Sequence, residues 1–233
     1  MMADIGVIFD MDGVIMDNNH FHEKAWRTFC EIHKVPLTSD ELHRYVFGRI
    51  AKDTIDYIFK KDHLQEEVDK YVNEKEEVYR KMYKNKIELV PGLQDFLDDL
   101  KENGVPIAIA TSAPRDNVEF VFKHLPIRTY FKFILDASDI KNGKPDPEIY
   151  LKSISKLGLE PGQCIVFEDS LSGVQSAFDT GAHVIAVSTT HKPEEFKNVD
   201  GIIKNFKNIN YKKLLSLSQK RNENQHSRIK KNL

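Results

Sequence analysis

The chain has 233 residues, of which 40% are hydrophobic, 10% aromatic and 30% charged, and its formal net charge is −2 at pH 7. This composition excludes intrinsic disorder over the whole chain, because it supplies enough apolar side chains to bury a core. The near-neutral charge gives no field that would attract nucleic acid, and no apolar run reaches the roughly 18 residues that a membrane helix needs.

Four short apolar runs predict buried strands, and polar residues follow each of them. In chain order they are Ile5–Phe9 before Asp10, Val105–Ala110 before Thr111 and Ser112, Cys164–Phe167 before Glu168 and Asp169, and Val184–Val187 before Ser188 and Thr189. The patterns of Leu93–Glu102, Asn117–His124, Pro147–Leu157 and Leu171–Thr180 predict helices between them. Strands that alternate with helices predict a Rossmann-like α/β core with a parallel sheet. The polar residues then gather in one crevice at its carboxyl edge.

The segment 18–88 interrupts this alternation. It contains no convincing strand, a capping-box pattern at Thr38–Glu41 and one long charged helical pattern over Leu64–Lys84. About 70 helical residues after the first strand cannot lie within the sheet. We therefore expect residues 18–88 to form an inserted helical domain, and residues 1–17 and 89–218 to form the α/β core.

The last residues, 219–233, differ from the rest of the chain. This tail carries five Lys/Arg and one acid, Glu223, so its net charge of +4 leaves −6 for the remainder. With few apolar side chains, we expect it to be a disordered, solvated end. The chain has only two cysteines and no signal-peptide pattern, which predicts a reduced, cytoplasmic protein without a disulfide framework. We expect a monomer that binds neither nucleic acid nor membrane.

Asp10 and Asp12 lie two residues apart directly after the first predicted strand. Two such carboxylates repel one another unless a cation or a proton lies between them. In phosphoryl transfer, one carboxylate attacks phosphorus and the other transfers a proton to the leaving oxygen. The alternative is an acidic turn in which Gly13 supplies a permissive backbone.

Three further clusters complete a phosphoryl-transfer site if they meet in space. Thr111 and Ser112 can donate to phosphoryl oxygens, or they can form a turn or a helix cap. Lys144 lies between glycine and prolines and can neutralise phosphate charge, or it can be a solvated surface lysine. Glu168 and Asp169 can coordinate Mg²⁺, although Asp169 or Ser170 can instead cap the following helix.

The four clusters together resemble the motifs of the haloacid dehalogenase superfamily, within it the β-phosphoglucomutase-like phosphatases. The motifs are Phe9–Val14, Ala110–Ser112, Gly143–Pro145 with Pro147, and Phe167–Ser170. The resemblance implies that Asp10 is the nucleophile and that Asp12 protonates the leaving group and then activates water. It also favours phosphate esters over carbon–halogen bonds, because dehalogenases lack the second aspartate.

The same resemblance assigns the remaining site residues. Mg²⁺ would be held by the Asp10 carboxylate, the Asp12 backbone carbonyl and Asp169, with Glu168 as a further ligand or as a neighbour of the ligands. Thr111 and the Ser112 N–H would hold the transferring group, and Lys144 would offset negative charge.

By resemblance, residues 18–88 form the family's α-helical cap. His22 falls at the position of a hinge histidine, and Lys75 near a cap lysine that meets substrate. The arginine with which β-phosphoglucomutase holds a distal phosphate is replaced here by Ala51. Arg49 or Lys52 could substitute for it.

These features predict a Mg²⁺-dependent phosphatase acting on a small phosphorylated metabolite, such as a sugar phosphate. Two other functions stay open: a β-phosphoglucomutase-like phosphomutase, and a non-enzymatic sensor on an inactive hydrolase fold. The intact set of Asp10, Asp12, Lys144 and Asp169 argues against the sensor.

Overall fold

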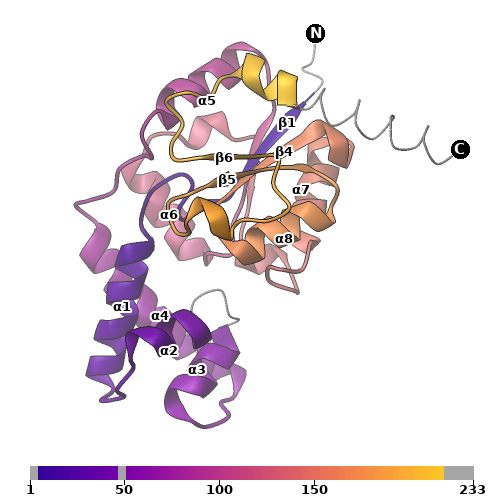
Figure 1. Cartoon of the computed structure of the whole chain (residues 1–233). Coiled ribbons are helices and arrows are strands. Elements are labelled where there is room, and N and C mark those ends of the chain that lie inside the picture. The colour runs from indigo at the N-terminus through magenta and orange to yellow at the C-terminus, as the bar shows by residue number, and fades with distance from the viewer. Residues whose placement is uncertain (1–4, 47–50, 218–233) are drawn as a thin grey trace, which may run out of the picture.

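A computed structural model describes residues 5–46 and 51–217. Six parallel strands form one sheet in the order β3-β2-β1-β4-β5-β6 (Figure 1). The strands are β1 (Gly6–Phe9), β2 (Ile107–Ala110), β3 (Phe133–Leu135), β4 (Cys164–Glu168), β5 (His183–Val187) and β6 (Gly201–Ile203). The predicted α/β core is confirmed. The sequence patterns identified β1, β2, β4 and β5 but missed the three-residue edge strands β3 and β6.

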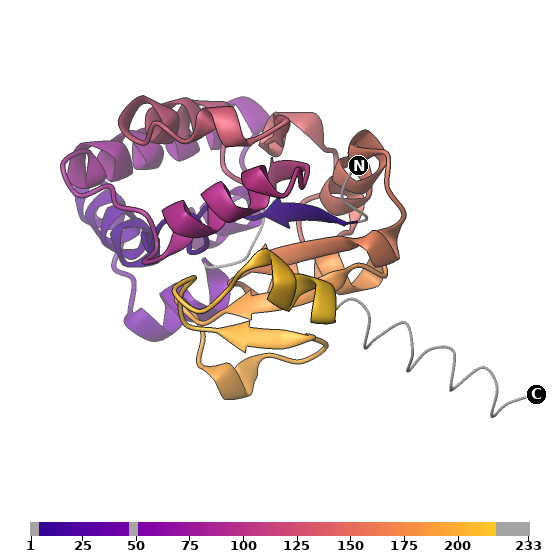
Figure 2. The same ribbon diagram turned by 90° about the horizontal axis from the view of Figure 1, so that it is seen from above.

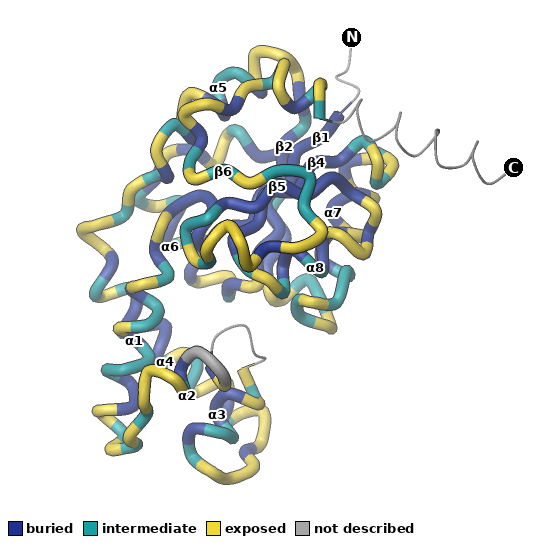
Figure 3. The backbone as a smooth tube through the Cα atoms, in the orientation of Figure 1, coloured by how far each residue is buried: buried dark blue, intermediate teal, exposed yellow. Residues whose placement is uncertain are grey.

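Helices cover both faces of the sheet, as Figures 1 and 2 show. These core helices are α5 (Leu93–Glu102), α6 (Arg115–His124), α7 (Glu148–Leu157) and α8 (Leu171–Asp179). Side chains of β1 alternate between the two faces: Val7 and Phe9 pack in the cluster that includes α5 and α6, and Ile8 in the one that includes α7 and α8. Every residue of β1 is buried (Figure 3), which explains why its sequence is continuously apolar.

Short 3₁₀ turns connect several of these elements. They are η1 (Arg128–Tyr130), η2 (Ala137–Asp139), η3 (Pro161–Gln163) and η4 (Pro193–Glu195).

Between β1 and α5, the described residues contain four helices that form a separate lobe, which we call the cap (Figure 1). They are α1 (Asn19–Ile32), α2 (Ser39–Tyr45), α3 (Ala51–Phe59) and α4 (Gln65–Tyr83). The described part of the cap contains no strand, and both the Thr38 capping box and the long helix α4 are confirmed. The cap has its own apolar cluster around Phe29, Ile55 and Val68. At its base, Tyr79 and Tyr83 of α4 join the core cluster instead.

The exact domain boundaries at residues 17/18 and 88/89 stay a prediction. Arg49 and the basic tail lie outside the described residues. Within residues 5–46 and 51–217, the helices are too short or too polar for any of them to cross a bilayer.

Candidate active site

The candidate site lies where the chain reverses its direction across the sheet. From β1 the chain continues to β2 and β3 on one side, and then returns to β4 on the other side of β1. Phe9 and Phe167 are register partners, and the Asp10 amide donates to the Phe167 carbonyl at 2.9 Å. The residues that end β1 and β4 therefore meet at the carboxyl edge of the sheet, which is where open α/β sheets bind ligands.

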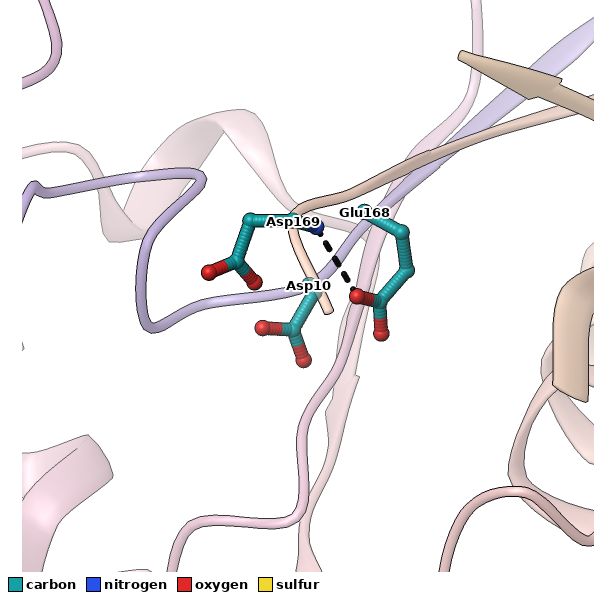
Figure 4. A group of neighbouring side chains, drawn as sticks. All are labelled: Asp10, Glu168 and Asp169. Atoms are coloured by element: carbon teal, nitrogen blue, oxygen red, sulfur yellow. Dashed lines mark hydrogen bonds between the residues drawn. The ribbon is translucent and has the colours of Figure 1, made fainter. Parts of the chain in front are cut away.

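Three carboxylates converge at this edge (Figure 4). Asp10, Glu168 and Asp169 are all buried, and each offers one oxygen atom within 4.8 Å of the others. Buried carboxylates at such distances repel one another unless a cation or protons offset their charge. Oxygen donors are the ligands that Mg²⁺ and Ca²⁺ prefer, so this set fits a hard divalent cation.

Lys144 brings one positive charge to this cluster. Its Nζ lies 2.6 Å from Asp10 Oδ1 and 2.6 Å from Glu168 Oε1, and its side chain is 7% exposed. The Nζ also lies 4.9 Å from the centroid of the Tyr150 ring. Lys144 is thus a buried cation shared by two carboxylates, and the alternative of a solvated surface lysine is wrong.

Glu168 has both of its oxygens occupied by the protein. Oε1 accepts from Lys144 and from the Tyr150 hydroxyl at 2.9 Å, and Oε2 accepts from the Asp169 and Ser170 amides at 2.9 and 3.0 Å (Figure 4). A Cβ on Gly173 would lie 1.7 Å from Oε1, so only glycine fits there. These contacts let Glu168 fix the position of Lys144. The oxygen atoms of Asp10 and Asp169 are therefore more available than those of Glu168 to bind a cation. Ser170, not Asp169, caps α8.

Burial sets the protonation of the cluster. It raises the pKa of Asp10 to about 7, because the attraction of Lys144 only partly offsets the lost hydration. Burial and the charges of Glu168 and Asp10 also raise the pKa of Asp169. For Glu168, burial is outweighed by Lys144, which lowers its pKa. Without a metal ion, Asp10 and Asp169 therefore retain protons more readily than ordinary aspartates.

This protonation predicts a pH-dependent stabilisation by Mg²⁺. A proton on Asp10 competes with the cation, so the rise in Tm caused by Mg²⁺ should be small near pH 5 and should grow as the pH passes about 7. In metal-free protein, the stability contributed by Asp10 changes with pH in the opposite direction. The folded-state pKa of Asp10 is above its usual value of 3.8, so its contribution to stability is greatest at low pH and is lost as the pH rises through about 7.

Differential scanning fluorimetry with and without Mg²⁺ across this pH range measures both effects, with NaCl at matched ionic strength as the control. A Mg²⁺-induced shift in Tm that is equal at both ends of the range would contradict competition between a proton and Mg²⁺ for Asp10.

The cap reaches the acidic cluster through Asn19. Asn19, at the first position of α1, donates from Nδ2 to Asp169 Oδ2 at 2.8 Å, and the Thr190 hydroxyl donates to the same oxygen. Gly13 lies against this contact with φ +76°, and a Cβ there would lie 2.0 Å from Asp169 Oδ2. Gly13 is therefore required by both its backbone conformation and the close approach of Asp169.

Asp12 is held by Asn18, which precedes the first cap helix. Asn18 Nδ2 donates to Asp12 Oδ1 at 2.5 Å and contacts the Tyr79 hydroxyl at 2.6 Å, while its Oδ1 accepts from the Gly13 amide at 3.0 Å. Burial raises the pKa of Asp12, but His22 and Asn18 outweigh it, so the pKa lies below its usual value. The Asp12 carboxylate thus contacts Asn18 and lies 3.7 Å from His22 Nε2 of the cap.

His22 and Lys75 meet beside Asp12. The His22 ring stacks on Tyr79 with centroids 3.8 Å apart, and its Nδ1 lies 2.8 Å from Lys75 Nζ. A charged lysine can only donate, so Nδ1 accepts and the ring proton sits on Nε2. His22 Nε2 lies 3.7 Å from Asp12 Oδ1 and makes no hydrogen bond to any of the described residues. The structure thus brings both predicted cap residues to the predicted acid/base.

Thr111 and Ser112 follow β2, the neighbour of β1. The Thr111 side chain is buried and its Oγ1 accepts from the Ala113 amide at 3.1 Å, whereas Ser112 is exposed. The carbonyl of Ala110, just before them, lies 3.4 Å from Lys144 Nζ. These contacts place the loop beside the cluster, and the predicted phosphate-binding roles stay predictions.

Sequence patterns missed the residues that orient the site. They are Asn18, Asn19, Glu76, Asn117, Tyr150 and Thr190. Asn18 does carry a signal, because it stands at the N-cap of α1. However, its side chain makes no capping bond and binds Asp12 and Gly13 instead. The other five lack a local pattern.

Comparison with known proteins decides the family. The model of haloacid dehalogenase-like hydrolases matches residues 7–187. The chain belongs to this family. A phosphorylated carbohydrates phosphatase of Thermotoga maritima is 32% identical over 175 residues, which are 75% of this chain and 81% of that protein.

Solved structures give the same result. A family IA, variant 3 hydrolase from Entamoeba histolytica matches with a TM-score of 0.86 and 32% identity, over 92% of this chain and 99% of that one. A β-phosphoglucomutase from Clostridium difficile matches with a TM-score of 0.79 and 26% identity, over 95% and 99%. The predicted family and its subgroup, near β-phosphoglucomutase and sugar phosphatases, are confirmed. The chain is a phosphatase of the haloacid dehalogenase-like family.

Proposed function

We propose that the protein is a Mg²⁺-dependent phosphatase that hydrolyses a small phosphorylated metabolite, of the sugar phosphate class, through a phosphorylated Asp10. One observation carries the proposal: Asp10 is paired with Lys144 at 2.6 Å and shares a buried oxygen cluster with Glu168 and Asp169. A buried carboxylate that contacts both a fixed lysine and a cation site has the environment of a nucleophile toward a phosphate dianion.

The reaction divides between Asp10 and Asp12. An Asp10 oxygen attacks phosphorus and the bond to the ester oxygen breaks, while Asp12 gives that oxygen a proton. Water then attacks the phosphorus of the acyl phosphate and loses its proton to Asp12, which releases inorganic phosphate and regenerates Asp10. The lowered pKa of Asp12 suits the second step. The negative phosphoryl group arriving beside it raises that pKa and favours the first.

Asp10, the Asp12 carbonyl and Asp169 would hold Mg²⁺, with Glu168 beside them. When bound, the ion supplies positive charge that lets the phosphate approach three carboxylates. Lys144 holds Asp10 Oδ1 on the side facing Glu168 and neutralises charge there throughout. The Thr111 hydroxyl and the Ser112 amide would hold the phosphoryl oxygens.

The cap supplies the remaining groups. His22 and Lys75 come from α1 and α4 and meet beside Asp12, so a substrate held between cap and core is shielded from bulk water. The monomeric state and the cytoplasmic location stay predictions.

The substrate class rests on the relatives. The Thermotoga relative is a phosphatase of phosphorylated carbohydrates, while another relative, in Bacillus subtilis, is a β-phosphoglucomutase at 27% identity over 78% of this chain. A mutase must hold a bisphosphate. Ala51, at the start of α3, offers no charge for a second phosphate. Lys52 is paired with Asp56, and Arg49, whose role stays a prediction, is outside the described residues. The uncharged Ala51 and the paired Lys52 favour hydrolysis over phosphomutase activity.

A substrate panel tests the proposal. Phosphate release from sugar and nucleotide monophosphates should require Mg²⁺, should stop with a chelator and should resume when Mg²⁺ is restored. In parallel, β-glucose 1-phosphate should yield free phosphate and glucose. Rapid conversion to glucose 6-phosphate with little free phosphate would establish the mutase instead, and Mg²⁺-independent release would refute the metal site.

A further inference from the structure

A second polar contact joins the cap to the core at a distance from the reacting carboxylates. Glu76 of cap helix α4 accepts at Oε2 from Asn117 Nδ2 of core helix α6, over 2.8 Å. Both residues are buried, with Asn117 1% and Glu76 8% exposed. Arg80, one turn along α4, donates from Nη1 to Asn117 Oδ1 at 2.8 Å. The cap thus provides both an acceptor and a donor for one amide of the core.

The chemistry of these partners leaves only one orientation for the Asn117 amide. Its oxygen must face the Arg80 guanidinium, which can only donate, and its NH₂ must face the Glu76 carboxylate. A flipped amide would place donor against donor and acceptor against acceptor. Asn117 therefore recognises Arg80 and Glu76 at the same time, which a residue that merely fills space does not do.

Further contacts lead from Glu76 toward Asp12, the proposed acid and base of the reaction. Glu76 Oε1 accepts from Lys75 Nζ at 2.8 Å, and the same Nζ lies 2.8 Å from His22 Nδ1. His22 Nε2 in turn points at Asp12. A chain of hydrogen bonds thus runs from Asn117 of core helix α6 through Glu76 and Lys75 to His22, whose Nε2 lies 3.7 Å from Asp12 Oδ1. Glu76 and Arg80 both bond the core at Asn117, a residue that takes no part in the proposed chemistry, and Glu76 also holds Lys75.

We propose that Glu76 and Asn117 are positioning residues that act as a latch: their hydrogen bond holds the cap closed and keeps Lys75 directed at His22. In the closed cap both residues are buried, and a buried carboxylate is costly unless it is hydrogen-bonded. The bond from Asn117 offsets this cost and so stabilises the closed arrangement. Glu76 also holds the Lys75 ammonium, so the same side chain that closes the cap orients the residues next to Asp12.

Two substitutions separate the two functions of the latch. Asn117→Ala removes both cap–core bonds of this amide, those to Glu76 and Arg80, and leaves the Glu76–Lys75 ion pair in place. Glu76→Gln keeps an oxygen for Asn117 and removes the charge that holds Lys75. The matched control is Glu77→Gln, the same change one residue along α4 at an exposed position. Should Asn117→Ala fail to fold, Asn117→Leu has a similarly branched side chain and can hydrogen-bond to neither Glu76 nor Arg80.

Cap closure is measured first, without substrate, so this readout is independent of the proposed function. Spin labels at Lys81→Cys on α4 and Lys123→Cys on α6 report the cap–core distance, since both positions are exposed and the native Cys30 and Cys164 are buried. We expect one short distance in the unsubstituted protein and in Glu77→Gln, and an added longer population in Asn117→Ala or Asn117→Leu. A distribution unchanged by both Asn117 variants would refute the latch.

The position of Lys75 is measured through Trp26, the single tryptophan, whose ring centroid lies 5.1 Å from Lys75 Nζ. Glu76→Gln should change the Trp26 emission and lower kcat while KM stays near the wild-type value. Asn117→Ala should lower kcat/KM by at least about 10-fold, because it removes hydrogen bonds to two charged groups. If Glu76→Gln matches Glu77→Gln in both emission and kcat, Glu76 has no positioning role. An inactive wild-type protein with an intact latch would refute the proposed function alone.

Discussion

Replacing Asp10 by Asn should abolish turnover while the protein remains folded. The amide cannot form the acyl phosphate, and loss of a catalytic nucleophile costs about 10⁴–10⁶-fold in kcat. Steady-state phosphate release measures the rate. A second measurement tests the chemistry directly: acid-quenched wild-type protein should carry radioactive phosphate from a labelled substrate that hydroxylamine removes, and Asp10→Asn should carry none.

The direction in which Asp10→Asn changes the stability can also be predicted. Burial raises the pKa of Asp10 to about 7, so at pH 8 its ionised carboxylate destabilises the metal-free fold. A neutral amide removes that charge, and the variant should melt no lower than the wild type in metal-free buffer. Asp95→Asn on the exposed face of α5 is the matched control. Wild-type phosphate release by Asp10→Asn would show that another residue is the nucleophile.

Replacing Lys144 by Met should damage both stability and catalysis. The side chain keeps its length but loses the charge that lies 2.6 Å from Asp10 and from Glu168. Removing one partner of a buried ion pair costs roughly 3–5 kcal/mol, because the remaining charges are left uncompensated. The loss of a fixed charge at the reacting group should lower kcat by on the order of 10²–10³-fold. Urea unfolding and phosphate release measure the two effects.

Lys141→Met provides the control for this variant. It is the same substitution in the same loop, at an exposed position three residues earlier. It should change neither the free energy of unfolding nor kcat appreciably. If Lys144→Met were as stable and active as Lys141→Met, the ion pairs of Lys144 would have no energetic role, and the charge balance inferred for the site would be wrong.

Local patterns were sufficient to predict most of the fold. Strands β1 and β4 are apolar along their whole length because they lie in the middle of the sheet, covered on both faces. The edge strands β3 and β6 escaped prediction because each has three residues and most of them are only partly buried, so no apolar run marks them. Their pairing is decided by neighbouring strands far away in the sequence.

The candidate site was predictable for a related reason. Asp10, Thr111 and Glu168 each follow a strand or end one, and parallel strands bring such positions to one edge. The residues that orient the site could not be predicted in this way. Tyr150 acts through Glu168, Asn117 through Glu76, and Asn19 through Asp169, and each pair is joined only by packing.

The amino-acid sequence alone determined the α/β core with its helical insertion, and it predicted which acidic and basic residues gather at the candidate site. Both depend on local composition and on strand ends, which short segments record. The tertiary structure alone decided the partners of each charge: that Lys144 bridges Asp10 and Glu168, that His22 faces Asp12, and that Glu76 meets Asn117 across the cap boundary. Such pairings arise where a buried charge must find a counter-charge or donor after the chain has folded, so they connect residues that no spacing in the sequence relates.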